Sequence, residues 1–178
     1  MRIFITGGCK NGKSTYAQRL AKKQGQQLYY IATMLAVDTE DDERIRRHQN
    51  ERDGWGFTTV EQPKNIEEIL QKCDTGGSFL LDSLTALLAN EMFTPSGVDI
   101  TARERIADGL KQVLQQVNDI VIVSDYIYSD AFIYDPLTEE YRKALAYLDR
   151  LAAGMCDQVL EVSYTNIMQH KGELHALS

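Results

Sequence analysis

Eight consecutive residues near the N-terminus carry the clearest chemical signal in this chain. The phosphate-binding pattern G-x-x-x-x-G-K-S is formed by Gly7, Gly8, Cys9, Lys10, Asn11, Gly12, Lys13 and Ser14. Its glycines let backbone N–H groups turn toward phosphate oxygens, Lys13 can reach the β- and γ-phosphates, and the Ser14 hydroxyl can ligate Mg²⁺. The alternative is a tight glycine turn beside a solvated lysine. We expect a P-loop that binds a nucleoside triphosphate with Mg²⁺, and we include Thr15, the next residue, among the nucleotide contacts.

A second group of polar residues follows the strands predicted farther along the chain. Asp82 ends a predicted strand, where a carboxylate can organise Mg²⁺ together with Ser14, although it can also cap the helix that follows. Asp125 and Asp130 follow another strand and can accept a proton from a substrate hydroxyl, or they are ordinary loop carboxylates. The same loop is rich in aromatic residues that can pack on a large planar ligand or fill the sheet edge: Tyr126, Tyr128, Phe132 and Tyr134.

A charged segment supplies a candidate nucleophile. Arg44, His48 and Arg52 are spaced by four residues and therefore share one face of a helix. The two guanidinium groups would lower the imidazole pKa and keep the ring neutral near pH 7, and a neutral imidazole can attack phosphorus. The alternative is a solvated helix stabilised by pairs such as Glu40 with Arg44 and Glu43 with Arg47.

The elements that must position these residues alternate between strand and helix patterns. Strands are predicted at residues 2–6, 27–33, 57–61, 79–82, 119–124 and 158–163. Helices are predicted at residues 13–23, 38–53, 63–73 (with Pro63 first), 83–93, 100–117 and 136–153, and the tail after residue 164 forms a hairpin or strand. This alternation predicts one α/β domain over residues 1–178, with a mostly parallel sheet and helices on both faces. Ligands bind such sheets beyond the carboxyl ends of the strands, where the loop residues above should meet.

Composition narrows the classes of function. The chain has 178 residues, of which 43% are hydrophobic and 25% charged, and its net charge of −7 argues against binding nucleic acid. No apolar run approaches the ~18 residues that span a bilayer, and the N-terminus begins directly with a strand, so we expect neither a membrane span nor a signal peptide. Cys9, Cys73 and Cys156 form no zinc pattern or disulfide framework. Free thiols fit a protein of the cytoplasm.

Several motifs together are more selective than the P-loop. They are G-G-x-x-x-G-K-S at 7–14, Y-I-A-T at 30–33, E-R-I-x-R-H-Q-x-x-R at 43–52, Trp55, T-V-E-x-P at 59–63 and L-L-D-S-L-T at 80–85. In this combination the chain resembles the adenosylcobinamide kinase / adenosylcobinamide-phosphate guanylyltransferase family of cobalamin biosynthesis, most closely in its first half. Where that family has Asn-Glu-Val-Gly, this chain has Ser-Asp-Tyr-Ile at 124–127, and of the family's later arginine-rich helix only Arg142 is clearly kept.

The resemblance implies a RecA-like P-loop NTPase fold and a two-step activity. GTP or ATP would phosphorylate the aminopropanol hydroxyl of adenosylcobinamide, and GTP would then transfer GMP to that phosphate through a GMP-histidine intermediate on His48. Arg44, Arg52, Glu61 and Asp82 would join the P-loop in binding nucleotide, and the family's trimeric state would carry over. Two other functions stay open: a small-molecule kinase without guanylyl transfer, and a nucleotide-binding regulator without turnover. A helicase or motor subunit is disfavoured by the acidic charge.

Overall fold

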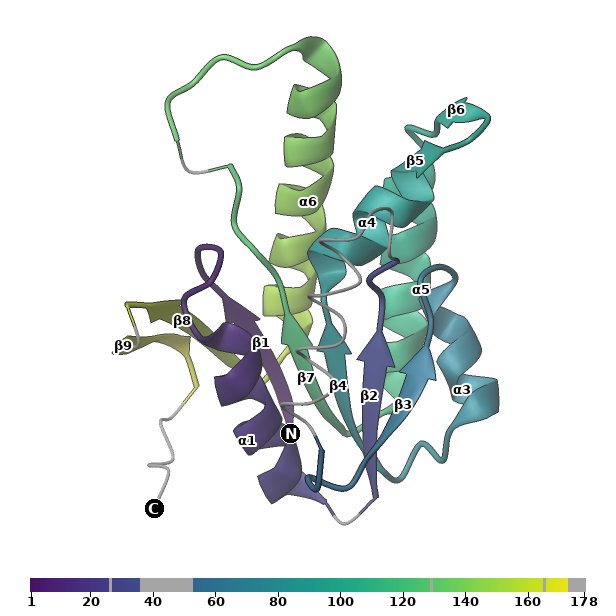
Figure 1. The fold of residues 1–178 in the computed structure, drawn as a ribbon, viewed down its shortest axis with the longest axis vertical. Helices are drawn as coiled ribbons and strands as arrows, with labels where there is room; N and C mark the ends of the chain where they lie inside the picture. The colour runs from purple at the N-terminus through teal and green to yellow at the C-terminus, as the bar shows by residue number, and fades with distance from the viewer. Residues whose placement is uncertain (26, 36–52, 129, 165, 173–178) are drawn as a thin grey trace.

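The fold is built around a mostly parallel sheet (Figure 1). The computed structural model describes residues 1–25, 27–35, 53–128, 130–164 and 166–172. Within them, seven strands have the order β3-β2-β4-β7-β1-β8-β9. Their bounds are β1 Arg2–Thr6, β2 Leu28–Ala32, β3 Phe57–Glu61, β4 Ser78–Asp82, β7 Asp119–Val123, β8 Gln158–Ser163 and β9 Asn166–Lys171. All neighbours pair in parallel except β9, which runs antiparallel to β8.

Helices cover both faces of this sheet. Their bounds are α1 Lys13–Gln24, the 3₁₀ helix η1 Ile66–Glu68, α3 Ile69–Lys72, α4 Leu84–Met92, α5 Ala102–Gln116 and α6 Pro136–Met155. Alternating side chains of each strand point to opposite faces, so the core forms two layers. One layer joins α1 to strand residues such as Ile3, Ile5 and Leu80, and the other joins α4, α5 and α6 to residues such as Phe4 and Leu81.

The parallel sheet with helices on both faces confirms the α/β fold expected from the sequence. The predicted strands and most predicted helices are present within a few residues of their expected bounds. The tail forms β9 in a hairpin with β8, and a short hairpin, β5 Phe93–Thr94 with β6 Gly97–Val98, extends the end of α4. The helix expected over residues 38–53 lies outside the described residues except for Asp53, which is in a turn.

The prediction that Pro63 begins a helix is wrong. The backbone of Asn65 is left-handed, with φ of 50°, and the 3₁₀ helix begins only at Ile66. The Gln62 side chain donates hydrogen bonds to the carbonyl oxygens of Lys64 and Asn65, the latter at 3.1 Å. A side chain that bonds the backbone locally competes with helix formation, and here it stabilises a turn instead.

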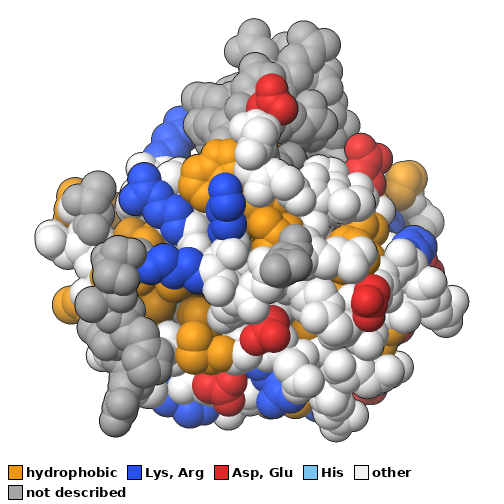
Figure 2. Space-filling model, turned by 90° about the horizontal axis from the view of Figure 1, so that it is seen from below, with side chains coloured by type: hydrophobic (Ala, Val, Ile, Leu, Met, Phe, Trp, Pro, Cys, Tyr) orange, Lys and Arg blue, Asp and Glu red, His pale blue; other side chains and the backbone are white. Residues whose placement is uncertain are grey.

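The end of the sheet opposite the P-loop exposes several basic side chains (Figure 2). Figure 2 views the end opposite the P-loop, where lysine and arginine side chains gather beside apolar ones. The last turn of α1 carries Lys22 and Lys23, which are stabilised near the partial negative charge of a helix C-terminus. None of the helices in the described ranges is both long enough and apolar enough to cross a membrane.

Candidate active site at the carboxyl end of the sheet

The predicted P-loop lies between β1 and α1, at the carboxyl end of the sheet (Figure 1). Gly7 and Gly12 have φ angles of 152° and 90°, which side-chain-bearing residues rarely adopt, and Gly12 precedes the first turn of α1. Asn11 donates a hydrogen bond to the carbonyl oxygen of Val162 and so ties the loop to β8. This strand–loop–helix arrangement directs backbone N–H groups of a helix N-terminus toward one point, which favours an anion.

Lys13 lies inside this loop rather than in solvent. Only 4% of its surface is exposed. Its Nζ donates to the carbonyl oxygen of Gly8 at 2.6 Å and to Oδ1 of Asp125 at 2.6 Å. The solvated-lysine alternative is therefore wrong. Ser14 is partly buried and Thr15 exposed in the first turn of α1, and Cys9 and Lys10 are exposed on the loop.

Asp125 reaches Lys13 because β7 is the parallel neighbour of β1. The carboxyl ends of the two strands meet, and the Tyr126 N–H donates to the carbonyl oxygen of Gly7 at 3.3 Å. The Asp125 N–H donates to the Thr85 hydroxyl at 2.9 Å, which fixes the turn after the strand. The sequence placed Asp125 after a strand but did not reveal this ion pair.

Asp82 ends β4 on the face of the sheet that α1 covers. Leu80, two residues earlier, packs in the α1 layer, so the alternation of the strand points Asp82 to the same side. The Tyr30 hydroxyl donates to Oδ2 of Asp82 at 2.8 Å. The capping alternative for Asp82 is wrong, since Ser83 caps α4 by accepting from the Ala86 N–H at 3.2 Å.

These oxygen donors fit a magnesium ion. The Asp82 carboxylate and the Ser14 hydroxyl belong to the same face and the same end of the sheet. No group of three or more metal-binding side chains occurs among the residues that the structure describes. Mg²⁺ bound beside nucleotide phosphates takes only one or two protein ligands and fills its remaining positions with phosphate oxygens and water. The two oxygen ligands offered by Ser14 and Asp82 are therefore enough for a magnesium ion of this kind.

Four expected site residues remain: Arg44, His48, Arg52 and Glu61. Arg44, His48 and Arg52 lie outside the described residues. Glu61 is exposed at the end of β3, an edge strand separated from β1 by β2, β4 and β7. Four strand spacings of ~4.8 Å place it roughly 19 Å from the P-loop strand, although at the same end of the sheet.

Asp149 is a buried carboxylate, electrostatically coupled to Asp125, that the sequence did not single out. It projects from α6, is 3% exposed, and accepts a hydrogen bond from the Tyr128 hydroxyl at 2.8 Å. Burial raises the pKa of Asp149 to about 6, although hydrogen bonds from Ser124 and Tyr128 oppose the increase. The sequence gave no signal for Asp149, because it is a polar position on a helix and is buried only where α6 meets the segment after β7.

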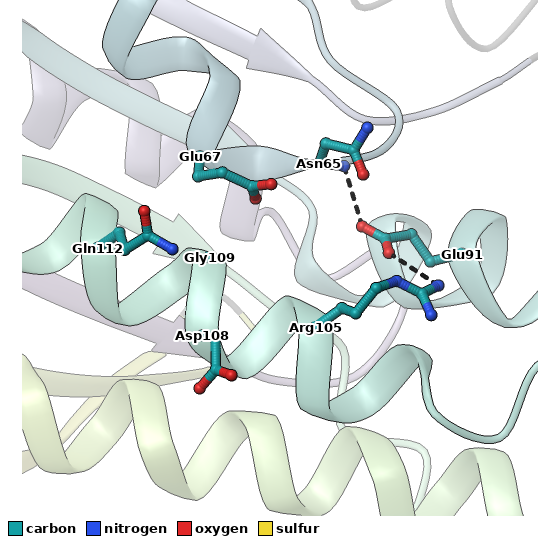
Figure 3. Close-up of a pocket in the computed structure, with 7 residues that line it drawn as sticks. All are labelled: Asn65, Glu67, Glu91, Arg105, Asp108, Gly109 and Gln112. Atoms are coloured by element: carbon teal, nitrogen blue, oxygen red, sulfur yellow. Dashed lines mark hydrogen bonds and ion pairs between the residues drawn. The ribbon is translucent and has the colours of Figure 1, made fainter.

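A small hollow of about 210 Å³ lies among η1, α4 and α5 (Figure 3). Its lining is polar and comprises Asn65, Glu67, Glu91, Arg105, Asp108, Gly109 and Gln112. Glu91 is buried there, accepts from the Asn65 N–H at 3.0 Å and pairs with Arg105 at 3.4 Å. These elements cover the face of the sheet opposite α1, so the hollow is separate from the phosphate-binding loop.

Known proteins are similar to this chain over nearly its whole length. A family model described as "Cobinamide kinase / cobinamide phosphate guanyltransferase" matches residues 3–166, so the match includes the second half of the chain. The bifunctional adenosylcobalamin biosynthesis protein CobP of Pseudomonas aeruginosa is 30% identical over 176 residues, 97% of this chain and 99% of that protein. The corresponding protein CobU of Salmonella typhimurium is 25% identical over 171 residues, 89% of this chain and 93% of that one.

Proposed function

Because the chain belongs to the cobinamide kinase / cobinamide phosphate guanyltransferase family, we propose that it catalyses both reactions of that family in cobalamin biosynthesis. It is an enzyme that transfers phosphorus-containing groups. The observation that best supports the proposal is Lys13, held inside the P-loop by Gly8 and Asp125. A cation in that position faces the phosphates of a bound nucleoside triphosphate.

In the kinase reaction, the aminopropanol hydroxyl of adenosylcobinamide attacks the γ-phosphorus. A bond forms from the hydroxyl oxygen to phosphorus, the bond to the β–γ bridging oxygen breaks, and the nucleoside diphosphate leaves. Lys13 turns from Asp125 to the phosphates and stabilises the charge that develops on them. Asp125 is then released from its ion pair and takes the proton of the attacking hydroxyl.

We propose that Ser14 and Asp82 hold the metal, and that Mg²⁺ neutralises phosphate charge when it is bound. Tyr30 keeps one carboxylate oxygen of Asp82 engaged and thereby orients the other. The remaining P-loop residues contribute backbone N–H groups that bind and orient the triphosphate.

In guanylyl transfer, a ring nitrogen of His48 attacks the α-phosphorus of GTP. The bond to the α–β bridging oxygen breaks and pyrophosphate leaves, so the enzyme carries GMP on a phosphorus–nitrogen bond. Arg44 and Arg52 stabilise the phosphate charge. A phosphate oxygen of adenosylcobinamide phosphate then attacks the same phosphorus, breaks the bond to His48 and forms adenosylcobinamide-GDP.

The covalent intermediate can be tested directly with GTP labelled at its α-phosphate. The wild-type enzyme should acquire a label that is stable to alkali and labile to acid, and adenosylcobinamide phosphate should discharge it. His48→Ala should acquire none. His170→Ala is the matched control, because His170 pairs with Glu161 on β9 and β8 and should leave the labelling intact. A label that survives in His48→Ala contradicts the assignment of this histidine.

The same experiment separates the two other functions. A kinase without guanylyl transfer would phosphorylate adenosylcobinamide from ATP or GTP but acquire no α-phosphate label. A regulator without turnover would bind nucleotide and consume none, even with adenosylcobinamide present.

We also propose that the enzyme assembles as a homotrimer, in line with the resemblance of its motifs to the family. Light scattering coupled to size-exclusion chromatography should give three times the chain mass of 20.2 kDa. A monomeric mass at working concentration would contradict this assembly.

A further inference from the structure

The segment between β7 and α6 carries large apolar side chains that the core does not use. It begins at Asp125, beside Lys13, and rises past the carboxyl end of the sheet next to the first turns of α6 (Figure 1). Phe132 is 73% exposed, Ile133 97%, Tyr134 38% and Leu137, in the first turn of α6, 40%. These four residues are called the apolar tip below.

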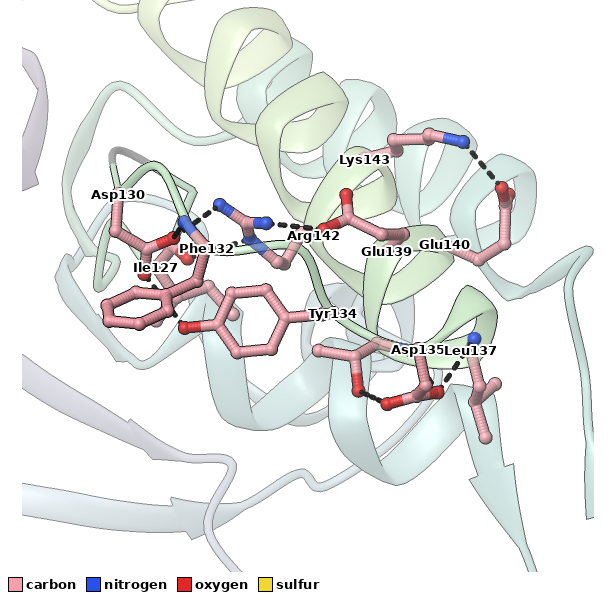
Figure 4. Close-up of polar contacts among 11 residues, drawn as sticks. Ile127, Asp130, Phe132, Tyr134, Asp135, Leu137, Glu139, Glu140, Arg142 and Lys143 are labelled. Carbon is pink, nitrogen blue, oxygen red and sulfur yellow. Dashed lines mark hydrogen bonds and ion pairs between the residues drawn. The ribbon is translucent and has the colours of Figure 1, made fainter.

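A buried arginine ties this segment to α6 through several polar contacts (Figure 4). Arg142 of α6 is 7% exposed, and its Nε donates to the carbonyl oxygen of Ile127 at 3.1 Å. Its two other nitrogens pair with Asp130 at 3.1 Å and Glu139 at 2.5 Å. Its guanidinium lies 4.6 Å from the centre of the Tyr134 ring.

Two further hydrogen bonds strengthen the anchor. The Tyr134 hydroxyl donates to Asp130 Oδ2 at 2.9 Å, so the ring, the carboxylate and the guanidinium of Arg142 form a closed set. Nearer to β7, the Tyr128 hydroxyl donates to the buried carboxylate of Asp149 at 2.8 Å. The segment is therefore fastened to α6 at both ends of its described course.

A segment that is fixed in place with its apolar side chains in water lowers the free energy of unfolding, unless a ligand buries those side chains. Fixing the backbone costs conformational entropy, and apolar side chains left in water recover none of this cost by burial. When such a surface is fixed before a ligand arrives, the ordering cost is not subtracted from the binding free energy. The arrangement thus favours a ligand that presents a broad, partly apolar surface.

We propose that the apolar tip is the wall of the site that receives the corrinoid, with Arg142 as its positioning residue. This inference rests on the proposed function. The triphosphate is a polar chain that the P-loop already binds, whereas a corrin macrocycle presents methyl groups and amide side chains around a wide ring. Phe132, Ile133 and Tyr134 offer matching apolar contacts, and the segment joins them to Asp125 at the phosphate site.

The test measures equilibrium binding of adenosylcobinamide, which needs no turnover. The double variant Phe132→Ser/Ile133→Ser removes two exposed apolar side chains and should weaken adenosylcobinamide binding by roughly 10-fold or more. GTP binding and formation of the α-phosphate label should stay within about twofold of wild type. Ile100→Ser is the matched control, because Ile100 is 69% exposed on another part of the surface and should leave all of these quantities unchanged.

Arg142 is tested through the same pair of affinities. Arg142→Met keeps the apolar stem but loses the contacts to Ile127, Asp130 and Glu139, so adenosylcobinamide should bind roughly 10-fold more weakly while GTP binding is kept. Lys143→Met, at the exposed neighbouring position, is the control. If Arg142→Met weakens both ligands equally, the arginine only maintains the fold and its positioning role is overturned.

Three other results have definite meanings. Unchanged adenosylcobinamide affinity in the double variant overturns the proposal. If the adenosylcobinamide affinity of the double variant is unchanged but its assembly mass is smaller, the apolar tip is instead a contact between copies of this chain. A third result separates the two proposals. If wild type binds adenosylcobinamide and the double variant does not, the apolar tip is part of the corrinoid site. If neither protein then transfers phosphate or GMP, the proposed catalytic function is wrong although this binding site is supported.

Discussion

Replacing Gly7 with alanine should destabilise this protein far more than replacing its neighbour Gly8. A Cβ built on Gly7 would lie 2.3 Å from the carbonyl oxygen of Val162 and 2.6 Å from Nδ2 of Asn11. The oxygen of Val162 is backbone of β8, where Val162 is paired with Ile167 of β9, so it cannot move aside without disturbing that strand. The φ angle of 152° adds a conformational penalty of its own.

The size of the effect follows from these two contributions. Overpacking a filled site costs about 1–3 kcal/mol, and holding a side-chain-bearing residue at such a φ costs about 1–3 kcal/mol. Gly7→Ala should therefore lose about 2–6 kcal/mol of unfolding free energy. For a chain of this size, that corresponds to a fall in Tm of roughly 4–24 °C.

Gly8→Ala is the control, because a Cβ there would meet no atom of the described residues within 4 Å. It should change the unfolding free energy by less than about 0.5 kcal/mol, yet weaken nucleotide binding by narrowing the loop. Urea unfolding and thermal scans of the three proteins, with GTP titrations beside them, give both quantities. Equal losses of stability in the two variants would refute the geometric argument.

Three further predictions concern charged side chains. Lys13→Ala should keep the fold but weaken nucleotide binding by about two orders of magnitude; unchanged affinity in a calorimetric titration would exclude a phosphate-binding role. Arg44→Ala should slow labelling of His48 more than it weakens GTP binding, whereas equal losses would mean that it contacts only ground-state nucleotide. Because burial raises the pKa of Asp149 from 3.8 to about 6, the folded state binds more protons between those values and its stability falls as pH rises through them. Asp149→Asn should remove this fall, on the order of 2–3 kcal/mol, and urea unfolding profiles that stay parallel to wild type would contradict it.

Local patterns were enough to predict much of the fold. The apolar run of β1, the glycine-rich loop and the helical pattern from Lys13 specify a strand, a loop and a helix without reference to distant residues. Pro63 shows the limit of such patterns. The local sequence predicts that a helix begins there, but the Gln62 side chain bonds the carbonyl oxygens of Lys64 and Asn65 and stabilises a turn. The motifs also identified the family, and the match over residues 3–166 extends that identification beyond the first half of the chain.

By itself, the sequence determined the phosphate-binding loop, the alternation of strands and helices, and the family. It did not determine which strand ends lie side by side, because alternation is compatible with several strand orders. Only the placement of β7 beside β1 joins Lys13 to Asp125 across 112 residues. Likewise, only the packing of α6 buries Asp149 and Arg142 against the segment that leaves β7. Such contacts depend on long-range packing free energy, which no local spacing of residues encodes.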